Sequence, residues 1–469
     1  MPIPRPNILF IMTDDQTIRE MSCYGSDILQ TPNMDRIARG GTRFNYCFAT
    51  NALCAPSRAT VLTGCYSHIH GIRGNSEQAD AIEVLNPNVP TFPELLQQAG
   101  YHTGLVGKYH IRQDPRGFDY WAIHPGQGDY FDPVFIENGV EIQKQGYATD
   151  ITTDLALDFL ESADRSQPFC LVYQFKAPHR PFSPAPRHEN LFSEIDIPVP
   201  ETFNDNYATR HIAGPAEDMQ FDISLARDYE DLPEGLNREE RKQWIYQRFI
   251  KDRFRTIYGV DENLGRVLDY LDMQGLAEDT LILYTSDHGY FLGDHGWYDK
   301  RFMYEPSIRI PLVAQYPRLG ISENVTDAMV MNIDYAPTIL DLAGVPIPDE
   351  MQGRSLRPLM EGETPEDWRS SIYYAYYENS WELHGKGEEA MAEPYKYFTP
   401  HRIGPHRGVR TDRYKLIEYY SEGDYRELFD LQEDPNELQN VYDDPAYADV
   451  VAAMEVELGR LRVMYEDEE

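Results

Sequence analysis

Short apolar runs alternate with helix-like stretches along most of the chain. Four of the runs, residues 7–12, 103–106, 168–175 and 281–285, are continuous and apolar enough to form central strands buried on both faces. Alternation of such strands with helices is typical of an α/β domain whose sheet is mostly parallel. The pattern therefore predicts a large central sheet flanked by helices.

Proline at the start and glycine at the end mark the boundaries of several expected helices. Thr31-Pro32 and Gly40-Gly41 enclose one helix, and Gly100 and Gly344 follow two others. A long charged stretch predicts one more helix that is much longer than the rest. The expected helices are 32–40, 92–99, 152–163, 237–274 and 334–343.

The sequence pattern changes after about residue 365. Residues 371–377 are expected to form a strand, and residues 408–420 alternate as strands of an antiparallel sheet do. Residues 446–465 have the pattern of a closing amphipathic helix. We therefore expect a large α/β domain at 1–365 and a smaller C-terminal α+β subdomain with an antiparallel sheet at 366–469.

The strongly negative net charge disfavours some classes of binding partner. Among 469 residues, 78 Asp and Glu stand against 42 Lys and Arg, which gives a formal charge of −36. Such a surface repels nucleic acid and anionic lipid, but it permits a local basic pocket for a small anion. No stretch approaches the length of a membrane span. We therefore expect neither nucleic acid nor a membrane as a partner.

The first residues and the cysteines bear on the cellular compartment. Residues 1–6 hold no apolar segment of a secretory signal, so the chain as given is expected to be cytoplasmic, or periplasmic or secreted if a leader was removed. Five cysteines in a chain of this length do not form a disulfide framework. Four of them are expected to be buried, apolar thiols, and Cys54 is the exception.

Polar residues follow directly on each of the four predicted strands. In an open α/β sheet, ligands bind beyond the carboxyl ends of the strands. Any one of these segments is explained by an ordinary polar turn, but four together predict a single site at one rim of the sheet. The segments are Thr13-Asp14-Asp15, Gly107-Lys108-Tyr109-His110, Lys176-Ala177-Pro178-His179 and Ser286-Asp287-His288-Gly289.

The carboxylates in these segments suggest a metal ion. If the strands before them are neighbours, Asp14, Asp15 and Asp287 would repel one another strongly unless a cation neutralises them. Oxygen ligands favour a hard ion, Ca²⁺ or Mg²⁺, over zinc, and His288 would add a nitrogen ligand that is unusual for calcium. The alternative for the Asp14-Asp15 pair alone is a solvated turn with a helix cap.

Residues 51–64 carry the most distinctive chemistry. Pro56 suits the first turn of a helix, which would place Cys54 at or near the helix N-terminus. The unpaired amides and the helix dipole favour negative charge there, and Arg58 lies one turn further along the same face. The segment therefore predicts a nucleophile with its own anion site. As a bare thiol, Cys54 would suit phosphoryl or acyl transfer.

The motifs as a set resemble a known family. Cys54-Ala55-Pro56-Ser57-Arg58, with Leu62-Thr63-Gly64 after it, is similar to the signature of the type I sulfatases, the formylglycine-dependent family of the alkaline-phosphatase-like superfamily. The resemblance covers nearly the whole chain, including the C-terminal stretches 408–417 and 427–441. The other matching motifs, in the family's order, are Asn7-Ile8-Leu9, Asp14-Asp15, Gly107-Lys108, His110, Ala177-Pro178-His179, Ser286-Asp287-His288-Gly289 and Lys300.

The resemblance implies a sulfuric ester hydrolase with an alkaline-phosphatase-like fold, in which residues 1–365 are catalytic and residues 366–469 contribute to the substrate pocket. It implies that a formylglycine-generating enzyme oxidises Cys54 to Cα-formylglycine, whose hydrate is the nucleophile. The positions matching Asp14, Asp15, Asp287 and His288 then hold Ca²⁺ together with residue 54, with Mg²⁺ or Mn²⁺ less expected. Many members carry Asn where this chain has His288, which is a mild departure.

The remaining catalytic roles are also implied by the resemblance. Arg58 and Lys108 would stabilise the hydrate and its charge, and His110 would accept a proton from it. His179 and Lys300 would face the leaving oxygen as acids or hydrogen-bond donors. Arg301 is the rival of Lys300 for that position.

The substrate is expected to be a small anionic sulfate ester, and a sulfated saccharide above all. Residues 125–130 and 293–297 look like those of glycan-desulfating members, both hexosamine-6-sulfatase-like and iduronate-2-sulfatase-like. Trp297, Tyr109 and Tyr130 would stack on a sugar face, and the alternative for each is core packing. His401 and His406, in the locally basic loop 378–406, would bind sugar hydroxyls or a carboxylate, with an ordinary surface loop as the alternative.

Two other functions stay open at this point. A phosphonate monoester or phosphodiester hydrolase of the same superfamily shares the Cys-X-Pro-Ser-Arg signature, and both ester types are anionic tetrahedra. A catalytically silent, acidic calcium-binding protein is the alternative from another class. A phosphomonoesterase like alkaline phosphatase is disfavoured, because such sites use Ser or Thr with zinc.

Overall fold

The computed structural model describes residues 5–75, 83–210, 219–378, 403–420 and 425–468. Within these ranges the chain forms two compact units. The first unit draws on 1–193, 251–289 and 309–368, and the second on 194–250, 290–308 and 369–469. The second unit is therefore assembled from three separate stretches of the chain. The functional division at 365/366 stays a prediction.

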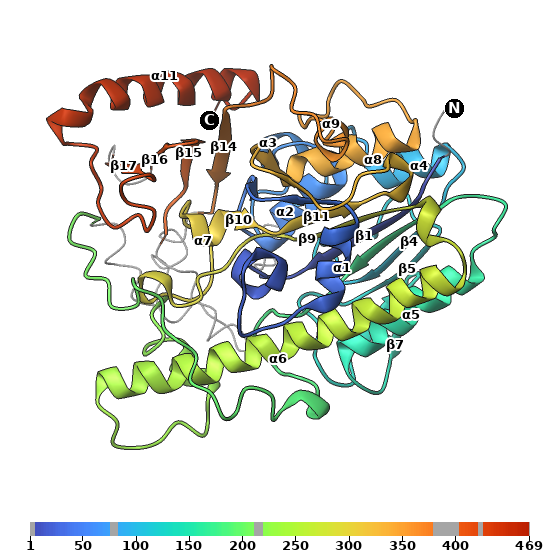
Figure 1. Ribbon diagram of the computed structural model, residues 1–469, viewed down its shortest axis with the longest axis horizontal. Coiled ribbons are helices and arrows are strands. Elements are labelled where there is room, and N and C mark those ends of the chain that lie inside the picture. The colour runs from blue at the N-terminus through green and yellow to red at the C-terminus, as the bar shows by residue number, and fades with distance from the viewer. Residues whose placement is uncertain (1–4, 76–82, 211–218, 379–402, 421–424, 469) are drawn as a thin grey trace. The chain divides into compact units, whose positions relative to one another are not determined.

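The main sheet of the first unit has ten strands within the described ranges, in the order β12-β2-β11-β9-β1-β8-β4-β5-β6-β7 (Figure 1). The four strands expected from the sequence are β9, β1, β8 and β4, and they are adjacent and parallel. Their carboxyl ends therefore meet at one edge. The bounds are β1 Asn7–Thr13, β2 Thr42–Phe44, β4 His102–Gly107, β5 Tyr120–Ile123, β6 Val134–Glu137, β7 Val140–Gln143, β8 Phe169–Gln174, β9 Thr280–Ser286, β11 Leu312–Gln315 and β12 Asn324–Thr326.

The central strands are apolar throughout because both faces of the sheet are covered. In β1, Ile8, Phe10 and Met12 belong to a core cluster that includes residues of α2, α4 and α8, while Leu9 and Ile11 are buried on the opposite face. The helices α4 and α8 lie on one side of the sheet and α5 on the other (Figure 1). The α-helices are α1 Pro32–Gly40, α2 Cys54–Thr63, α3 Ser67–His70, α4 Phe92–Gln98, α5 Ala148–Ser162, α6 Arg238–Met273, α7 Glu305–Ile308, α8 Tyr335–Ala343, α9 Arg357–Met360 and α11 Ala448–Met464.

The expected helices agree with α1, α4, α6 and α8 to within two residues at each end. The exception is α5, which begins at Ala148 rather than at residue 152. Tyr147 forms the N-cap without a capping side chain, and no proline stands in the first turn, so the sequence does not mark this helix start. The hydroxyls of Thr152 and Thr153 donate to the carbonyls four residues earlier, at 2.8 and 2.7 Å.

The outer strands were not expected from the sequence. β6 and β7 form an antiparallel hairpin at one edge of the sheet, and every residue of β7 is exposed. At the other edge, β11 and β2 pair antiparallel. A second, three-stranded sheet contains β3 (Cys47–Phe48), β10 (Arg309–Ile310) and β13 (Val330–Met331). These strands are short and carry little apolar pattern of their own.

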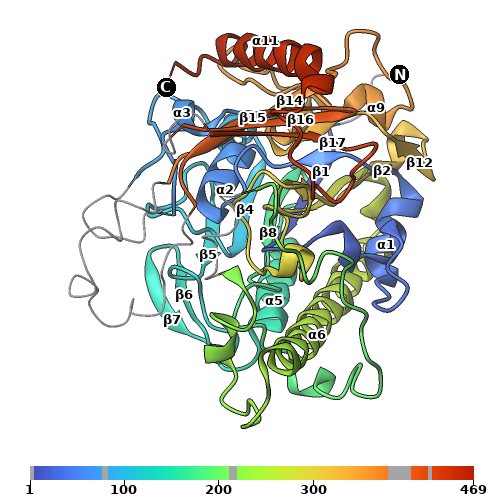
Figure 2. The same cartoon turned by 90° about the vertical axis from the view of Figure 1, so that its left-hand side faces the viewer.

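The second unit contains a four-stranded antiparallel sheet within the described ranges, in the order β14-β15-β16-β17, and α11 packs along it (Figure 2). The bounds are β14 Ser371–Tyr376, β15 His406–Thr411, β16 Tyr414–Tyr419 and β17 Tyr425–Asp430. The predicted fold class, a mostly parallel central sheet flanked by helices with a smaller C-terminal antiparallel sheet, is confirmed. Among the described residues, no helix combines the length and hydropathy needed to cross a bilayer.

Candidate active site

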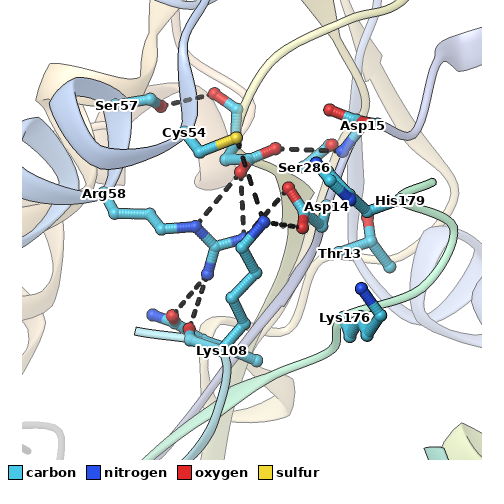
Figure 3. A network of polar contacts seen from close by, with 12 residues as sticks. Thr13, Asp14, Asp15, Cys54, Ser57, Arg58, Lys108, Lys176, His179 and Ser286 are labelled. Carbon is cyan, nitrogen blue, oxygen red and sulfur yellow. Dashed lines mark hydrogen bonds and ion pairs between the residues drawn. The ribbon is translucent and has the colours of Figure 1, made fainter. Parts of the chain in front are cut away.

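Cys54 is the first residue of α2, as the sequence predicts. Leu53 before it has an extended backbone and forms the N-cap, and the side chain of Asn75 accepts a hydrogen bond from the Ala55 N–H at 3.1 Å. Every residue of α2 is buried, and Cys54 is 0% exposed. Figure 3 shows its sulfur directed toward Asp14, Asp15 and Lys108. The helix N-terminus therefore faces charged side chains in the protein interior.

The three aspartates come from the ends of two adjacent strands. Asp14 and Asp15 follow β1, and Asp287 follows β9. All three are at most 1% exposed. The Asp15 N–H donates to Asp287 Oδ1 at 3.1 Å, and the Asp15 backbone has φ of 75°, a left-handed conformation that few residues other than glycine adopt. The parallel register of β1 and β9 is what brings these carboxylates together.

The hydrogen bonds of His288 orient its ring toward the carboxylates. Nδ1 lies 3.0 Å from the Gly289 carbonyl, so this nitrogen carries the proton and Nε2 presents its lone pair. Nε2 lies 3.4 Å from Asp15 Oδ1, 3.5 Å from Asp287 Oδ1 and 3.4 Å from Cys54 Sγ. Acceptor atoms this close together repel one another, and a metal ion among them would relieve that repulsion.

The donor set fits a divalent cation. One ligand atom each from Asp14, Asp15, Cys54 and His288 lies within 4.8 Å of the others, and all four residues are buried. Burial raises the pKa of Asp287, and the carboxylates of Asp14 and Asp15 raise it further, although His288 and Arg58 oppose this. A bound cation would relieve that repulsion. With Asp287, whose Oδ1 lies 3.5 Å from His288 Nε2, three of the five candidate ligands are carboxylates, which favours a hard ion.

Arg58 links all four strand ends, since its NH2 group also lies 3.6 Å from Asp14 Oδ1. It is 1% exposed, and its Nε and NH2 groups donate to Asp287 Oδ2 at 3.1 and 2.9 Å. Its NH1 group donates to the Lys108 carbonyl at 2.6 Å and to Gln174 Oε1 at 2.7 Å. Burial alone lowers the pKa of Arg58, but the Asp287 and Asp14 carboxylates outweigh it and raise the pKa. The guanidinium therefore stays charged inside the protein.

Lys108 extends into the same cluster from the end of β4. Its Nζ forms an ion pair with Asp14, donates to Gln127 Oε1 at 2.6 Å and lies 3.9 Å from Cys54 Sγ (Figure 3). The preceding Gly107 has φ of 100°, and a Cβ there would lie 1.7 Å from the Gln174 carbonyl oxygen. Glycine is therefore required for β4 to approach β8 closely enough to place Lys108.

The two predicted catalytic histidines lie in the first unit and are almost fully buried. His110, two residues beyond Lys108, is 6% exposed and has a left-handed backbone with φ of 59°. His179 is 7% exposed, and its Nδ1 lies 2.8 Å from the Arg180 carbonyl. That contact places a proton on Nδ1, so proton exchange at His179 takes place at Nε2. The hydroxyl of Tyr130 donates to the His179 carbonyl at 2.6 Å.

Three residues of the cluster had no predicted role. Gln174 ends the apolar strand β8 and contacts Arg58, and Gln127 contacts Lys108. Lys176 is 3% exposed and donates to the carbonyls of Gln127 and Arg180, at 3.1 and 3.3 Å. Burial lowers the pKa of Lys176 to about 8, and the charge of Lys108 adds to this. Gln174 and Lys176 stand next to an otherwise apolar run, and Gln127 lies within residues 125–130, but the contacts Arg58–Gln174, Lys108–Gln127 and Lys176–Gln127 join residues that are distant in the sequence.

Two predicted substrate-binding side chains are fully buried within the second unit, which corrects the expectation. The indole of Trp297 is covered on both faces, since Tyr207 and Phe302 stack on it at centroid distances of 5.3 and 5.0 Å. His406 is 0% exposed, its Nδ1 lies 3.0 Å from the Gly404 carbonyl, and burial lowers its pKa to about 4. Neither offers a surface to a sugar.

The remaining residues that the sequence analysis assigned to the substrate or the leaving group lie in different parts of the protein. Tyr109 and Tyr130 are 2% and 3% exposed, and their stacking on a sugar stays a prediction. Lys300 lies in the second unit, with its Nζ 3.5 Å from Asp299 Oδ1 and over the ring of Tyr290. Arg301, its rival, pairs with the same aspartate at 2.9 Å. His401 lies outside the described residues.

The chain matches models of known protein families over most of its length. A model described as Sulfatase matches residues 6–345. A second model, described as N-sulphoglucosamine sulphohydrolase, C-terminal, matches residues 383–464.

Individual proteins agree with the family models. The chain is 43% identical to an N-acetylglucosamine-6-O-sulfatase of Bacteroides thetaiotaomicron, over 95% of this chain and 84% of that protein. It is 31% identical to an N-acetylglucosamine-6-sulfatase of Homo sapiens, over 79% of this chain and 67% of that protein. A solved protein in complex with its substrate D-glucosamine-2-N,6-O-disulfate matches with a TM-score of 0.88 and 41% identity, over 99% of both chains.

A phosphonate monoester hydrolase of Agrobacterium radiobacter matches with a TM-score of 0.73, over 98% of this chain and 96% of that chain. At 24% identity this likeness extends to the fold alone. The family models and the more similar relatives are sulfatases. The chain therefore belongs to the sulfatase family and is a sulfuric ester hydrolase.

Proposed function

We propose that this chain releases inorganic sulfate from the 6-position of a sulfated glucosamine residue. The substrate assignment is supported by the relative at 43% identity, named for N-acetylglucosamine 6-O-sulfate, and by the structural match at 41% identity whose substrate carries a 6-O-sulfate. The observation that carries the proposal is the buried cluster in which Cys54, the three aspartates and the two cations Arg58 and Lys108 converge.

In this proposal Asp14, Asp15, Asp287 and His288, together with residue 54, hold a divalent cation, and Ca²⁺ is the ion that suits the donor set best. When bound, the cation supplies Lewis-acid charge to the oxygens of the sulfate group. His288 donates its Nδ1–H to the Gly289 carbonyl, which keeps Nε2 directed at the ion.

Residue 54 is proposed to act as Cα-formylglycine, made from Cys54 by a formylglycine-generating enzyme. The hydrated aldehyde supplies the oxygen nucleophile that a thiol does not offer. The position of Cys54 at the N-terminus of the buried helix α2 supports this role, because backbone N–H groups and the helix dipole favour an anion at that point.

The charge balance of the cluster favours a single anionic substrate. The carboxylates of Asp14, Asp15 and Asp287 are matched in number by Arg58, Lys108 and Lys176, so the six charges cancel when all are ionised. A divalent cation then leaves an excess of two positive charges in a site from which water is excluded. Coulomb attraction for a sulfate monoester, which carries one negative charge, is strong in such surroundings.

The histidines are proposed to move the protons. His179 holds a proton on Nδ1 against the Arg180 carbonyl, so its Nε2 is the atom that would protonate the departing alcohol oxygen. His110, by its match to the family motif, would accept a proton from the hydrate at residue 54 as sulfate is released. Lys300 is assigned to the leaving oxygen by the same kind of match.

The test uses the full chain purified from cells that convert the cysteine, with the aldehyde verified by peptide mass spectrometry. Sulfate release from N-acetylglucosamine-6-sulfate and from glucosamine-2-N,6-O-disulfate is measured by ion chromatography, with the Cys54→Ala variant as control. We expect release of the 6-O-sulfate by the wild type and none by the variant.

Aryl phosphonate and phosphodiester substrates are tested in parallel. Turnover of these esters with no sulfate release would identify the phosphonate or phosphodiester hydrolase instead. A chain that keeps a thiol at position 54 in its native cell, and turns over neither ester type, would be a silent cation-binding protein.

A further inference from the structure

A buried ion pair lies beside the candidate metal ligand Asp15, and one of its two members, Glu20, is also close to Asp15 in the sequence. Glu20 ends the short helix η1 (Ile18–Glu20), and Arg253 lies in the part of α6 that belongs to the first unit. Both side chains are 0% exposed, and Arg253 Nε and NH2 each lie 2.9 Å from a different oxygen of the Glu20 carboxylate. This bidentate arrangement is among the strongest that an arginine makes with a carboxylate.

The same guanidinium contacts the backbone of a candidate metal ligand. Arg253 NH2 donates to the main-chain oxygen of Asp15 at 2.7 Å, while the Asp15 N–H donates to Asp287 Oδ1 at 3.1 Å. Asp15 has a left-handed backbone with φ of 75°. A non-glycine residue stays in that conformation only where its surroundings determine it. Arg253 and Asp287 hold Asp15 at both of its backbone polar groups.

Glu20 also ties together the segment that follows Asp15. The Thr17 N–H donates to Glu20 Oε2 at 2.9 Å, so one carboxylate binds both the start of this turn and Arg253. Because Glu20 balances the charge of Arg253, the pair adds no net charge beside a divalent cation. It therefore fixes geometry without repelling the ion.

Stability alone is a weak reason to bury such a pair. Removing two charges from water costs several kcal/mol for each ion, and apolar residues of similar volume often serve stability as well or better. What an apolar pair would not reproduce is the hydrogen bond from Arg253 to the Asp15 carbonyl.

We propose that the Glu20–Arg253 pair positions the metal ligand Asp15 and so raises the affinity of the site for a divalent cation. The inference rests on the proposed function, in which Asp15 is a ligand. Groups that orient metal ligands from outside change metal affinity by roughly 10- to 100-fold when they are removed. We expect a loss within that range.

The test is the double variant Glu20→Gln/Arg253→Met. Gln keeps an acceptor for the Thr17 N–H, and Met fills the volume of the arginine stem, while the bond to Asp15 is lost and no buried charge is left alone. The matched control is Asp252→Asn/Arg255→Met on the same helix. There Arg255 pairs with Asp252 at 2.7 Å and donates to the Leu191 carbonyl at 2.8 Å.

Calcium binding is measured by titration calorimetry with CaCl₂ on the full chain after treatment with a chelator, and the fold is checked by circular dichroism. We expect the Kd for Ca²⁺ to rise at least tenfold in Glu20→Gln/Arg253→Met and to stay within twofold of wild type in the control. If the double variant does not fold, Arg253→Lys is used. Lysine keeps the positive charge opposite Glu20 but lacks the guanidinium that donates to both Glu20 and the Asp15 carbonyl. We therefore expect a severalfold rise in the Kd for Ca²⁺.

Two results contradict the inference in different ways. If the wild type binds Ca²⁺ and the double variant binds it with the same Kd, the positioning role alone is overturned. Where Arg253→Lys replaces the double variant, an unchanged Kd has the same meaning. A wild type without saturable Ca²⁺ binding would overturn the proposed metal site, and the positioning role with it.

Discussion

The close approach of β4 and β8 gives a sharp test of how the fold builds the site. Replacing Gly107 with Ala would put a Cβ 1.7 Å from the Gln174 carbonyl oxygen, whereas real Cβ contacts are essentially never under 3.0 Å. The backbone has φ of 100° there, so the variant also takes on the strain of a left-handed alanine. Gly100 is a matched control, because it has φ of 89° with nothing within 4 Å of the added Cβ.

The structure sets the expected magnitude. Both variants incur the conformational cost, about 1–2 kcal/mol. Gly107→Ala must also separate the two strands, which adds about 1–3 kcal/mol of overpacking. The Lys108 N–H, which donates to the same Gln174 oxygen at 3.0 Å, loses its bond at a further cost of about 1 kcal/mol. The difference between the variants is therefore about 2–4 kcal/mol.

Scanning calorimetry at a fixed scan rate measures this difference as apparent Tm. For a unit of this size we expect Gly107→Ala to melt about 3–7 °C below Gly100→Ala. Its kcat/KM for sulfate release should fall at least tenfold, because Lys108 and Gln174 move with the strands, while Gly100→Ala should keep wild-type activity. Equal Tm values and equal activities in the two variants would refute the argument that strand contact places Lys108.

Three further predictions follow from the site. Cys54→Ala and Asp287→Asn should each abolish sulfate release, measured by ion chromatography, and wild-type turnover in either would contradict the site assignment. Because burial lowers the pKa of Lys176 to about 8, its positive charge is lost as the pH rises through that value. KM for a sulfate ester should therefore rise above pH 8 in the wild type and stay constant in Lys176→Arg. Identical KM–pH profiles in the two proteins would show that the charge of Lys176 does not contribute to substrate binding. His406→Ala should lower Tm by several degrees with KM unchanged, because the ring is buried among Tyr374, Tyr376 and Tyr419. A raised KM with an unchanged Tm would indicate that His406 contacts the substrate after all.

The central strands were predictable because burial on both faces leaves a continuous apolar run. β1, β4, β8 and β9 carry that signal, but the order in which they lie side by side is known only from the structure. β7 carries no such signal, since all its residues are exposed and only pairing with β6 makes it a strand.

The candidate site was predictable where one short segment holds both a chemical group and its local geometry. Cys54 and Arg58 lie within a single turn of α2, and Asp14-Asp15 directly follow a strand. Gln174 and Arg253 act through partners that are distant in the sequence, so no local pattern marks them, and the segment that places Lys176 at the rim does not show its contact with Gln127. Trp297 was assigned wrongly because a sequence does not tell which aromatic rings are covered by others.

The most direct test of the site is a crystal structure of the full chain grown in Ca²⁺, with data collected to locate the ion by anomalous scattering. We expect a single strong peak among the side chains of Asp14, Asp15, Asp287, His288 and residue 54, within bonding distance of the aspartate oxygens. Well-ordered side chains with no anomalous peak among them, or an anomalous peak at another place in the protein, would contradict the proposal.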